Sequence, residues 1–332
     1  MAEQSRPTIR DVAARAGVSY QTVSRVINGS DGVRPATRVR VEAAIDELGF
    51  RPNAIAQFMA TGSTHTLTCL SPNLTDYTFA CIIEGAEQEA RQQGYFLFSA
   101  SAPDEATFDL LLDQMVASRR TEGLLVINPY ADRRFTLLPD TVPTVFVGAR
   151  PREESVGSVA LDDVGAGRLA TRHLLDLGHR RIGLICGPDE EDCTQDRLSG
   201  YLDALAAAGV TGDPGLIMEG DWSATSGYQA LARLLELDSP PTAIFAQNDR
   251  MAVGVLRAAR DRGLRIPEDL AVIGVDDMPL ASYFDPPLTT LRQDLYAIGR
   301  QAAQLVIQTV EHPESPRQHL LLPAELVVRQ ST

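Results

Sequence analysis

The first fifty residues carry the repeating apolar pattern of short helices. In residues 8–16 the apolar positions recur at the three- and four-residue spacing of one helix face: Ile9, Val12, Ala13 and Ala16. Thr8 can cap the start of this helix. Gly17 can end it, because glycine accepts the left-handed conformation that follows many helices. The pattern predicts a helix between these two residues.

A second helix is predicted after a loop of only two residues, Gly17 and Val18. Ser19 is placed to cap this helix, and Asn28-Gly29 to stop it. Its inward-facing positions are Val23, Val26 and Ile27. The short loop forces the two helices to cross sharply.

A third helix is predicted over residues 34–49, with Pro35 in its first turn. The positions expected to be buried are Val39, Val41, Ala44, Ile45 and Leu48. Helix, tight turn, helix and supporting helix form the helix-turn-helix arrangement. The pattern therefore predicts an all-α N-terminal domain of this kind.

From residue 66 onward, short apolar runs alternate with longer amphipathic segments. The expected strands are 66–72, 95–100, 122–128, 144–149 and 158–163, and then 181–187, 215–220, 242–249 and 270–277. Segments with helical spacing include 79–94, 107–120, 196–209 and 227–237. This alternation predicts parallel sheets flanked by helices, and its two rounds predict two lobes with a cleft between them. Ligands bind beyond the carboxyl ends of such strands, so strand-terminal polar residues become the candidate site.

The segment between these regions, RPNAIAQFMATGSTHT, has helical spacing in its middle and helix breakers or small polar residues at both ends. It fits a plain linker. The apolar residues Ile55, Phe58 and Met59 favour instead a short helix that packs on a surface.

Charge is divided unevenly along the chain, which has 332 residues and a net charge of −14. Residues 1–62 hold eight arginines and six acids, a charge of +2, which leaves −16 for the remainder. A basic head on an acidic body suits a protein whose head alone meets phosphates. No apolar run is long enough to span a membrane, and the N-terminus lacks an apolar signal core, so we expect a cytoplasmic protein.

Residue usage removes much enzyme chemistry. All thirty basic residues are arginine, which excludes a P-loop, Schiff-base or kinase lysine. The five histidines lack metal-ligand spacing, and the four cysteines contain no Cys-x-x-Cys pair. The run GAGRLA at 165–170 matches a weak dinucleotide motif, but small residues that pack a helix on a sheet explain it more simply. We therefore expect no catalytic residues, metal or cofactor.

Motifs along the whole chain resemble the lac repressor family of bacterial transcriptional regulators. They are GVSYQTVSRV, RPNAIA, LLDLGHRRIGLICGP, RLSGY, PTAIFAQNDRMAVGVL, GLRIPEDLAVIGVDD and PPLTTLRQDL, in family order. Each is weak alone and specific in combination. The resemblance implies a helix-turn-helix DNA-binding head, a hinge and a two-lobed α/β domain similar to periplasmic sugar-binding proteins.

For the head, the resemblance implies that the second helix lies in the major groove of DNA. Tyr20, Gln21 and Arg25 would face base edges, where Gln can pair with adenine and Arg with guanine. The residues implied to bind phosphates are Ser19, Thr22, Ser24, Asn28, Thr37 and Asn53. For Thr22 and Ser24, plain solvated helix surface is the alternative.

The linker would form a hinge helix in the minor groove, with Ala56 and Met59 at the DNA. Met59 stands where the family usually has Leu, and packing on its own effector domain is the alternative for it. Arg34 stands where the family commonly has a capping Ser, so a cap bond is lost and a phosphate contact becomes available.

For the two-lobed domain, the resemblance implies an effector site made by Asp76, Phe79, Arg197, Trp222, Asn248 and Asp276. Less certain lining residues are Arg150, Glu191, Cys193, Asp249 and Gln293. Arginine and aspartate can pair with adjacent hydroxyls, and Trp222 offers a flat face to a sugar ring, although a lone Trp is also a common core residue. Thr78 and Glu191 argue against a stacked purine, so we favour a neutral sugar.

The predicted domains are a head at 1–51, a hinge at 52–63, a first lobe at 64–162 with 291–322, and a second lobe at 163–290 with 323–332. The expected partners are a double-stranded DNA operator, a small sugar and a second copy of the chain, without a membrane. A repressor released by its effector is favoured. A corepressor-dependent or activating regulator, and a solute-binding protein of the same fold, are the alternatives.

Overall fold

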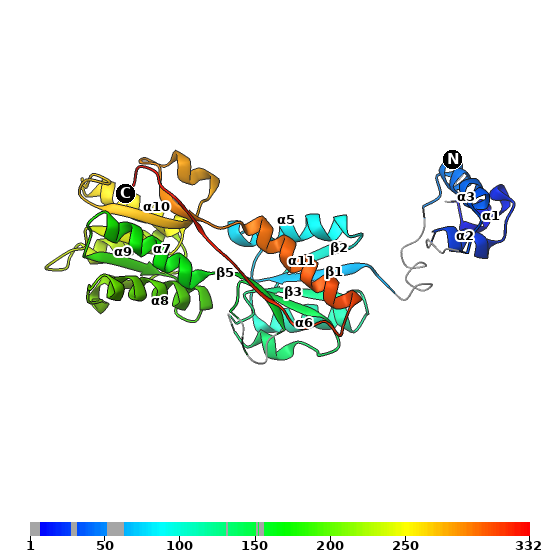
Figure 1. Ribbon diagram of the computed structural model, residues 1–332, viewed down its shortest axis with the longest axis horizontal. Helices are drawn as coiled ribbons and strands as arrows, with labels where there is room; N and C mark the ends of the chain where they lie inside the picture. Colours follow the sequence, from blue (N-terminus) through cyan, green and yellow to red (C-terminus); the bar gives the residue numbers. More distant parts are fainter. Residues whose placement is uncertain (1–6, 28–31, 52–62, 131, 151, 153–155) are drawn as a thin grey trace. The chain divides into compact units, whose positions relative to one another are not determined.

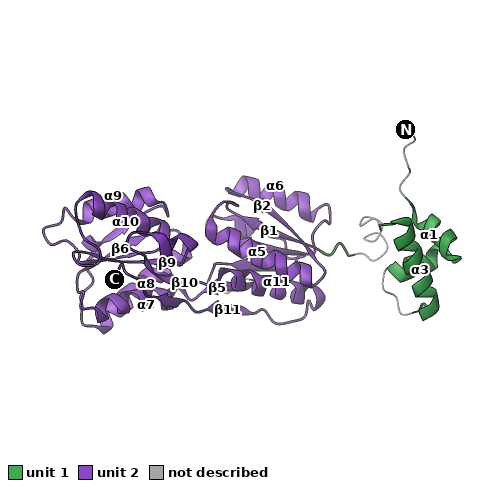
Figure 2. Cartoon of the chain, turned by 90° about the horizontal axis from the view of Figure 1, so that it is seen from above, with its two compact units in different colours: residues 1–65 green, residues 66–332 purple. Residues whose placement is uncertain are grey.

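The computed structural model describes residues 7–27, 32–51, 63–130, 132–150, 152 and 156–332. The chain forms two compact units, residues 1–65 and 66–332 (Figure 2). Four predicted DNA-contact residues, Asn28, Asn53, Ala56 and Met59, lie outside the described residues. Within the described ranges, no helix has the length and apolar character needed to cross a membrane.

The first unit holds the three predicted helices, α1 (Ile9–Ala16), α2 (Tyr20–Ile27) and α3 (Pro35–Leu48). The Asp11 carboxylate accepts hydrogen bonds from the backbone N–H and the hydroxyl of Thr8, both at 2.7 Å, and so fastens the start of α1. Gly17 ends that helix at φ 64°, in the left-handed region. The small core is built on side chains from all three helices: Val12, Ala13, Ala16, Val23, Val26, Val41 and Ala44.

One buried position of α3 was predicted wrongly. Val39 is 65% exposed, whereas Val41 is fully buried. Residues two apart on an α-helix point about 200° apart, so both cannot face the same core. Arg34 precedes α3 and makes no side-chain cap bond, as its departure from serine predicts.

The second unit contains two six-stranded sheets, one in each lobe (Figure 1). The first sheet is parallel throughout, in the order β11 (His319–Leu322), β5 (Gly157–Leu161), β4 (Thr144–Val147), β3 (Gly123–Ile127), β1 (Thr66–Ser71) and β2 (Phe96–Ser101). The second has the order β12 (Glu325–Val327), β10 (Thr289–Arg292), β9 (Ala271–Asp276), β8 (Ala243–Ala246), β6 (Ile182–Cys186) and β7 (Ile217–Glu219), with only β12 antiparallel.

Helices cover both faces of each sheet. Alternate residues of a strand therefore join different apolar clusters, one on each face. In the first lobe, α5 (Tyr77–Gln92) and α11 (Leu295–Glu311) pack on one face and α6 (Glu105–Val116) on the other. In the second lobe, α7 (Asp163–Asp176) and α8 (Asp192–Ala207) share one face, and α9 (Ala224–Leu234) and α10 (Asp249–Asp261) share the other. Short 3-10 turns occupy Arg134–Leu137, Pro214–Leu216 and Pro279–Tyr283.

Three helix pairs cross at glycines: α5 with α11, α7 with α8, and α9 with α10. A Cβ added to any of these six glycines would lie 1.9–2.3 Å from a carbonyl oxygen of the partner helix: Gly85, Gly167, Gly200, Gly227, Gly254 and Gly299. Gly167 of the GAGRLA run packs against α8, while Ala166 and Ala170 of the same run join the apolar cluster on the sheet, as predicted.

The chain crosses between the lobes three times, after β5, after β10 and after β11 (Figure 1). The predicted boundary after residue 290 cuts through β10. Leu291 and Arg292 pair with Val275 and Asp276 of β9, so they belong to the second sheet. The return to the first lobe therefore falls between Arg292 and the start of α11.

Candidate functional site

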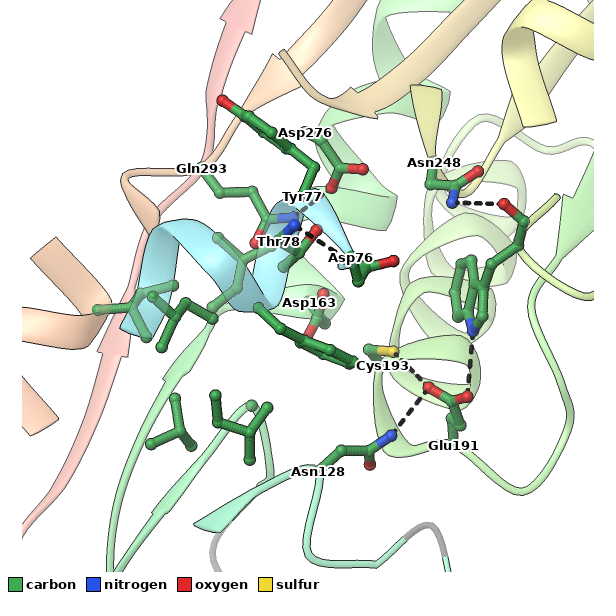
Figure 3. A pocket seen from close by; sticks show the side chains of 18 of the residues that line it. Asp76, Tyr77, Thr78, Asn128, Asp163, Glu191, Cys193, Asn248, Asp276 and Gln293 are labelled. Carbon is green, nitrogen blue, oxygen red and sulfur yellow. Dashed lines mark hydrogen bonds between the residues drawn. The ribbon is translucent and has the colours of Figure 1, made fainter. Parts of the chain in front are cut away.

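A pocket lined by both polar and apolar side chains lies between the lobes, at the carboxyl ends of the parallel strands (Figure 3). The empty space in and around it is about 850 Å³, a volume that includes open solvent. All six residues predicted as primary effector contacts line it: Asp76, Phe79, Arg197, Trp222, Asn248 and Asp276. Three of the five less certain residues do so too: Glu191, Cys193 and Gln293.

The other two residues predicted to line the site, Arg150 and Asp249, lie outside this lining. Arg150 turns to the second lobe, where its guanidinium lies 3.3 Å from the Asp192 carboxylate and 3.1 Å from that of Asp196. Asp249 follows Asn248 by one position in α10 and points back into the core. There it accepts hydrogen bonds from the Thr290 hydroxyl at 2.6 Å and the Met278 N–H at 2.8 Å.

Arg197 is buried at the centre of the second lobe's side of the pocket. Its Nε donates to Asp163 at 2.7 Å, and its Nη1 donates to the backbone carbonyl of Gln247 at 2.6 Å. Burial lowers the pKa of Arg197, but its acidic neighbours, led by Asp163, together outweigh this effect, so the pKa lies above its ordinary value and the group stays charged. Nη2 has no hydrogen-bond partner among the described residues, which leaves its two N–H groups for a ligand.

Trp222 is the single tryptophan of the chain, and three neighbours fix its position. Its backbone has φ 65°, a conformation that L-residues rarely adopt, and its carbonyl accepts a hydrogen bond from the Asn248 amide at 3.1 Å. Gly187, directly after β6, leaves the space that the indole fills. The Trp222 Nε1–H donates to Glu191 at 3.1 Å (Figure 3). Because these contacts hold Trp222 in a strained backbone conformation, its indole is already positioned to stack on a ligand.

Glu191 links the lobes across one end of the pocket. One carboxylate oxygen accepts from Trp222 in the second lobe, and the other accepts from the Asn128 amide, at 3.2 Å, in the first lobe. Burial raises the pKa of Glu191, and no cation pairs with it in the described part of the chain. Burial also raises the pKa of the nearby Cys193 thiol, which therefore stays protonated.

Asp76 links the lobes a second time. It caps α5, with one carboxylate oxygen accepting from the Thr78 N–H at 2.9 Å. Its other oxygen lies 2.7 Å from the guanidinium of Arg250, which belongs to α10 of the second lobe. Because Asp76 and Arg250 both line the pocket, a ligand between the lobes meets an ion pair that is already formed.

Asp276 ends β9 with φ 121°, a strained conformation that turns its side chain toward the pocket. One carboxylate oxygen accepts from the Gln293 amide at 2.6 Å. Burial raises the pKa of Asp276 to about 7, although Arg197 and Gln293 oppose the shift. At neutral pH this carboxyl group is poised between the charged and the neutral form.

Asn248 serves the protein more than a ligand. Its Oδ1 accepts from the Met251 N–H at 2.8 Å and caps α10, while its Nδ2 holds the Trp222 carbonyl. We predicted a donor and an acceptor for a sugar here. One lone pair of its oxygen and one of its N–H groups are already used within the protein, which leaves one acceptor position and one N–H for a ligand.

Sequence reasoning missed three lining residues that the geometry makes prominent, Asn128, Asp163 and Arg250. Asn128 and Asp163 are the last residues of the expected strands 122–128 and 158–163. Because polar residues at strand ends are candidates for the site, both could have been predicted. Arg250 follows Asn248 by two positions, and only its contact with the opposite lobe reveals a role.

The recognition helix of the first unit has the exposure that DNA contact requires. Tyr20 is 57% exposed, and Gln21 and Arg25, four residues apart, are exposed too. The Ser19 hydroxyl accepts from the Thr22 N–H at 3.2 Å and lies 3.0 Å from its hydroxyl, which confirms Ser19 as the cap of α2. The other predicted phosphate contacts that the structure describes, Thr22, Ser24 and Thr37, are half-buried.

A helix-turn-helix head and a two-lobed domain with a pocket between its lobes are typical of a ligand-responsive DNA-binding regulator. Residues 8–53 match the bacterial regulatory proteins of the lacI family, and residues 171–332 match a periplasmic binding protein-like domain. The transcriptional repressor CytR of Escherichia coli K12 is 34% identical over 99% of this chain and 97% of its own length. The regulator CelR of Thermobifida fusca is 37% identical over the full length of both proteins.

Solved structures agree with this assignment. The lac repressor dimer bound to operator and the anti-inducer ONPF superposes with a TM-score of 0.87, at 31% identity over 98% of this chain and 99% of that one. A CelR–cellobiose complex superposes with a TM-score of 0.77, at 36% identity over 98% and 100%. The chain therefore belongs to the lacI family of bacterial regulatory proteins, and it is a DNA-binding transcriptional regulator.

Proposed function

We propose that this protein is a cytoplasmic repressor that binds a pseudo-palindromic operator as a homodimer and is released by a neutral sugar bound between its lobes. The observation that carries the proposal is the pocket itself. It combines a fixed indole face, Trp222, with the carboxyl group of Asp276 and the unused Nη2 group of Arg197. Ring stacking with flanking hydroxyl partners is the common chemistry of sugar recognition.

The charges of the pocket support a neutral effector over a phosphorylated one. Both guanidinium groups that line it already pair with carboxylates, Arg197 with Asp163 and Arg250 with Asp76. The remaining acids, Glu191 and Asp276, have no cation partner in the described ranges. A phosphate group would therefore lose its hydration next to unneutralised carboxylates, whereas sugar hydroxyls can donate to them. That the related CelR is solved with cellobiose agrees with this choice.

On the DNA side, the proposal places Tyr20, Gln21 and Arg25 at base edges. Serine, threonine and asparagine hydroxyls or amides would hold phosphates: Ser19, Thr22, Ser24, Asn28, Thr37 and Asn53. Ala56 and Met59 would sit in the minor groove. Two heads are needed because one short helix reads only a half-site. The solved lac repressor dimer on its operator supports this arrangement.

Effector and operator would be linked through the lobes. A sugar in the pocket contacts both lobes and competes with the Asp76–Arg250 and Asn128–Glu191 bonds, so it favours a different lobe arrangement from the effector-free one. That change weakens DNA binding by linkage. No covalent step is required, so the proposal assigns the protein no catalytic activity.

The test is selection of bound sites from random DNA with the purified full-length protein, repeated with a panel of neutral mono- and disaccharides and their phosphates. A palindromic site that is lost in one neutral sugar is the expected result. Enrichment only in the presence of a ligand would make the protein corepressed, and loss caused only by a sugar phosphate would refute the charge argument.

A further inference from the structure

The first turns of α8 present two different faces to the molecule. Cys193 and Arg197, four residues apart, line the effector pocket. Asp192 and Asp196, also four residues apart, instead meet the segment that follows β4 in the first lobe. One helix therefore touches the pocket on one side and the opposite lobe on the other.

Two arginines of the first lobe form ion pairs with these two aspartates. The Asp192 carboxylate lies 2.7 Å from the guanidinium of Arg152 and 3.3 Å from that of Arg150, which also reaches Asp196 at 3.1 Å. The Arg152 guanidinium lies 3.4 Å from the centre of the Tyr130 ring, which holds it against the first lobe. Every one of these ion pairs joins one lobe to the other.

The burial of the acids gives the cluster its strength. The side chains of Asp192 and Asp196 are only 8% and 17% exposed, whereas those of Arg150 and Arg152 are 46% and 36% exposed. If the lobes separated, Asp192 and Asp196 would lose the guanidinium groups that balance their charges. Because the arginine side chains are partly exposed, dissolved salt can screen the attraction that holds the lobes together.

We propose that Arg150, Arg152, Asp192 and Asp196 form an interlobe lock, an ion-pair cluster that holds the two lobes together before an effector arrives. None of these four residues, nor Tyr130, lines the pocket. An effector therefore does not compete with the interlobe lock for hydrogen-bond partners. The Asp76–Arg250 and Asn128–Glu191 bonds lie inside the pocket and are exposed to that competition. The lock therefore sets how readily the lobes open, and it makes opening depend on ionic strength.

Trp222 reports on this opening without any ligand. It is the chain's single tryptophan, and its indole donates a hydrogen bond to Glu191, the residue next to Asp192. Glu191 in turn accepts a hydrogen bond from Asn128 of the first lobe. Separation of the lobes breaks the Asn128 contact and exposes the indole to solvent. Collisional quenching of tryptophan fluorescence by acrylamide then measures the open fraction.

The experiment compares the effector-free, full-length protein at about 0.1 M and about 1 M NaCl, over which the Debye length falls from about 10 Å to about 3 Å. The variants are Arg150→Gln, Asp196→Asn and the double variant. The matched control is Arg168→Gln, which removes the 3.0 Å ion pair between Arg168 and Asp203, two residues of the same lobe.

For the wild type and the control, the quenching constant should rise about twofold or more with salt as the open population grows. Both lock variants should already show the high value at low salt and respond little to more salt. The double variant should raise the low-salt quenching constant by less than the sum of the two single increases, because Arg150 and Asp196 form one ion pair. A quenching constant that is independent of salt in the wild type, or single variants that match the control, would overturn the proposal.

Folding and function are separated by the design. Far-ultraviolet circular dichroism identifies a variant that fails to fold, and the salt response of the wild type alone then decides the outcome. Neither effector nor DNA is present, so an error in the proposed function leaves this result unchanged.

Discussion

Gly187→Ala should displace the tryptophan on which the proposed sugar site is built. A Cβ on Gly187 would lie 2.0 Å from Cζ2 and 2.3 Å from Cε2 of Trp222. Carbon atoms in contact prefer about 3.5 Å or more, so the indole must shift by about 1.5 Å. The backbone offers little relief, because the Trp222 carbonyl is tied to Asn248 at 3.1 Å.

The size of the effect follows from what the shift breaks. The hydrogen bond from Trp222 Nε1 to Glu191, 3.1 Å long, would be lost, which costs about 1.5 to 3 kcal/mol for a bond to a charged group. Overpacking of this kind also lowers the free energy of unfolding by about 1 to 3 kcal/mol. Because about 1.4 kcal/mol corresponds to a tenfold change in affinity, we expect sugar binding to weaken by roughly 10- to 100-fold.

The assay is titration of the selected sugar followed by Trp222 emission, with thermal unfolding measured on the same samples. Gly212→Ala is the matched control, since its new methyl group would meet only the flexible end of Leu202 at 3.1 Å. Operator binding without sugar should be unchanged in both variants. Sugar affinity in Gly187→Ala equal to that of the control would refute the placement of Trp222 in the site.

Three other changes test separate parts of the structure. Burial holds the pKa of Asp276 at about 7, so the native protein keeps a proton there that the unfolded chain releases near pH 4. The unfolding free energy should therefore fall as the pH rises between those values, and Asp276→Asn should flatten this slope in urea titrations; equal slopes would contradict the assignment. Gly254→Ala places a Cβ 1.9 Å from the Ala224 carbonyl oxygen, so thermal unfolding should report a loss of about 1 to 3 kcal/mol, and an unchanged midpoint would argue against the close helix crossing. Gln21→Ala should change which half-site is preferred in a binding selection, whereas Thr37→Ala should weaken all sites alike; the same profile for both would dismiss the separate roles.

Long periodic segments made most of the fold predictable. Strands of six residues such as β1 and β9 are rich in apolar residues and buried along nearly their whole length, because helices cover both of their faces. The strands β10, β11 and β12, of three or four residues each, escaped prediction. Their pairing is decided by neighbours far away in the chain, and this is why the boundary at residue 290 was misplaced.

The pocket was predictable where a residue ends a strand or begins a helix. Asp76, Asn248 and Asp276 occupy such positions, and the topology alone brings them together. Contacts across the lobes were not predictable in this way. Arg150 and Arg250 differ in role only through the carboxylate that each meets on the other lobe, which local sequence does not encode.

The central claim is that a sugar between the lobes controls DNA affinity, and Asp276→Ala tests it most directly. The sugar found by selection would be titrated into a complex of full-length protein with fluorescently labelled operator, for the wild type and the variant side by side. The account predicts release of the wild type, together with a variant that binds operator normally and stays bound at every sugar concentration. Release of both proteins at the same concentration would place the effector somewhere other than this pocket and contradict the account.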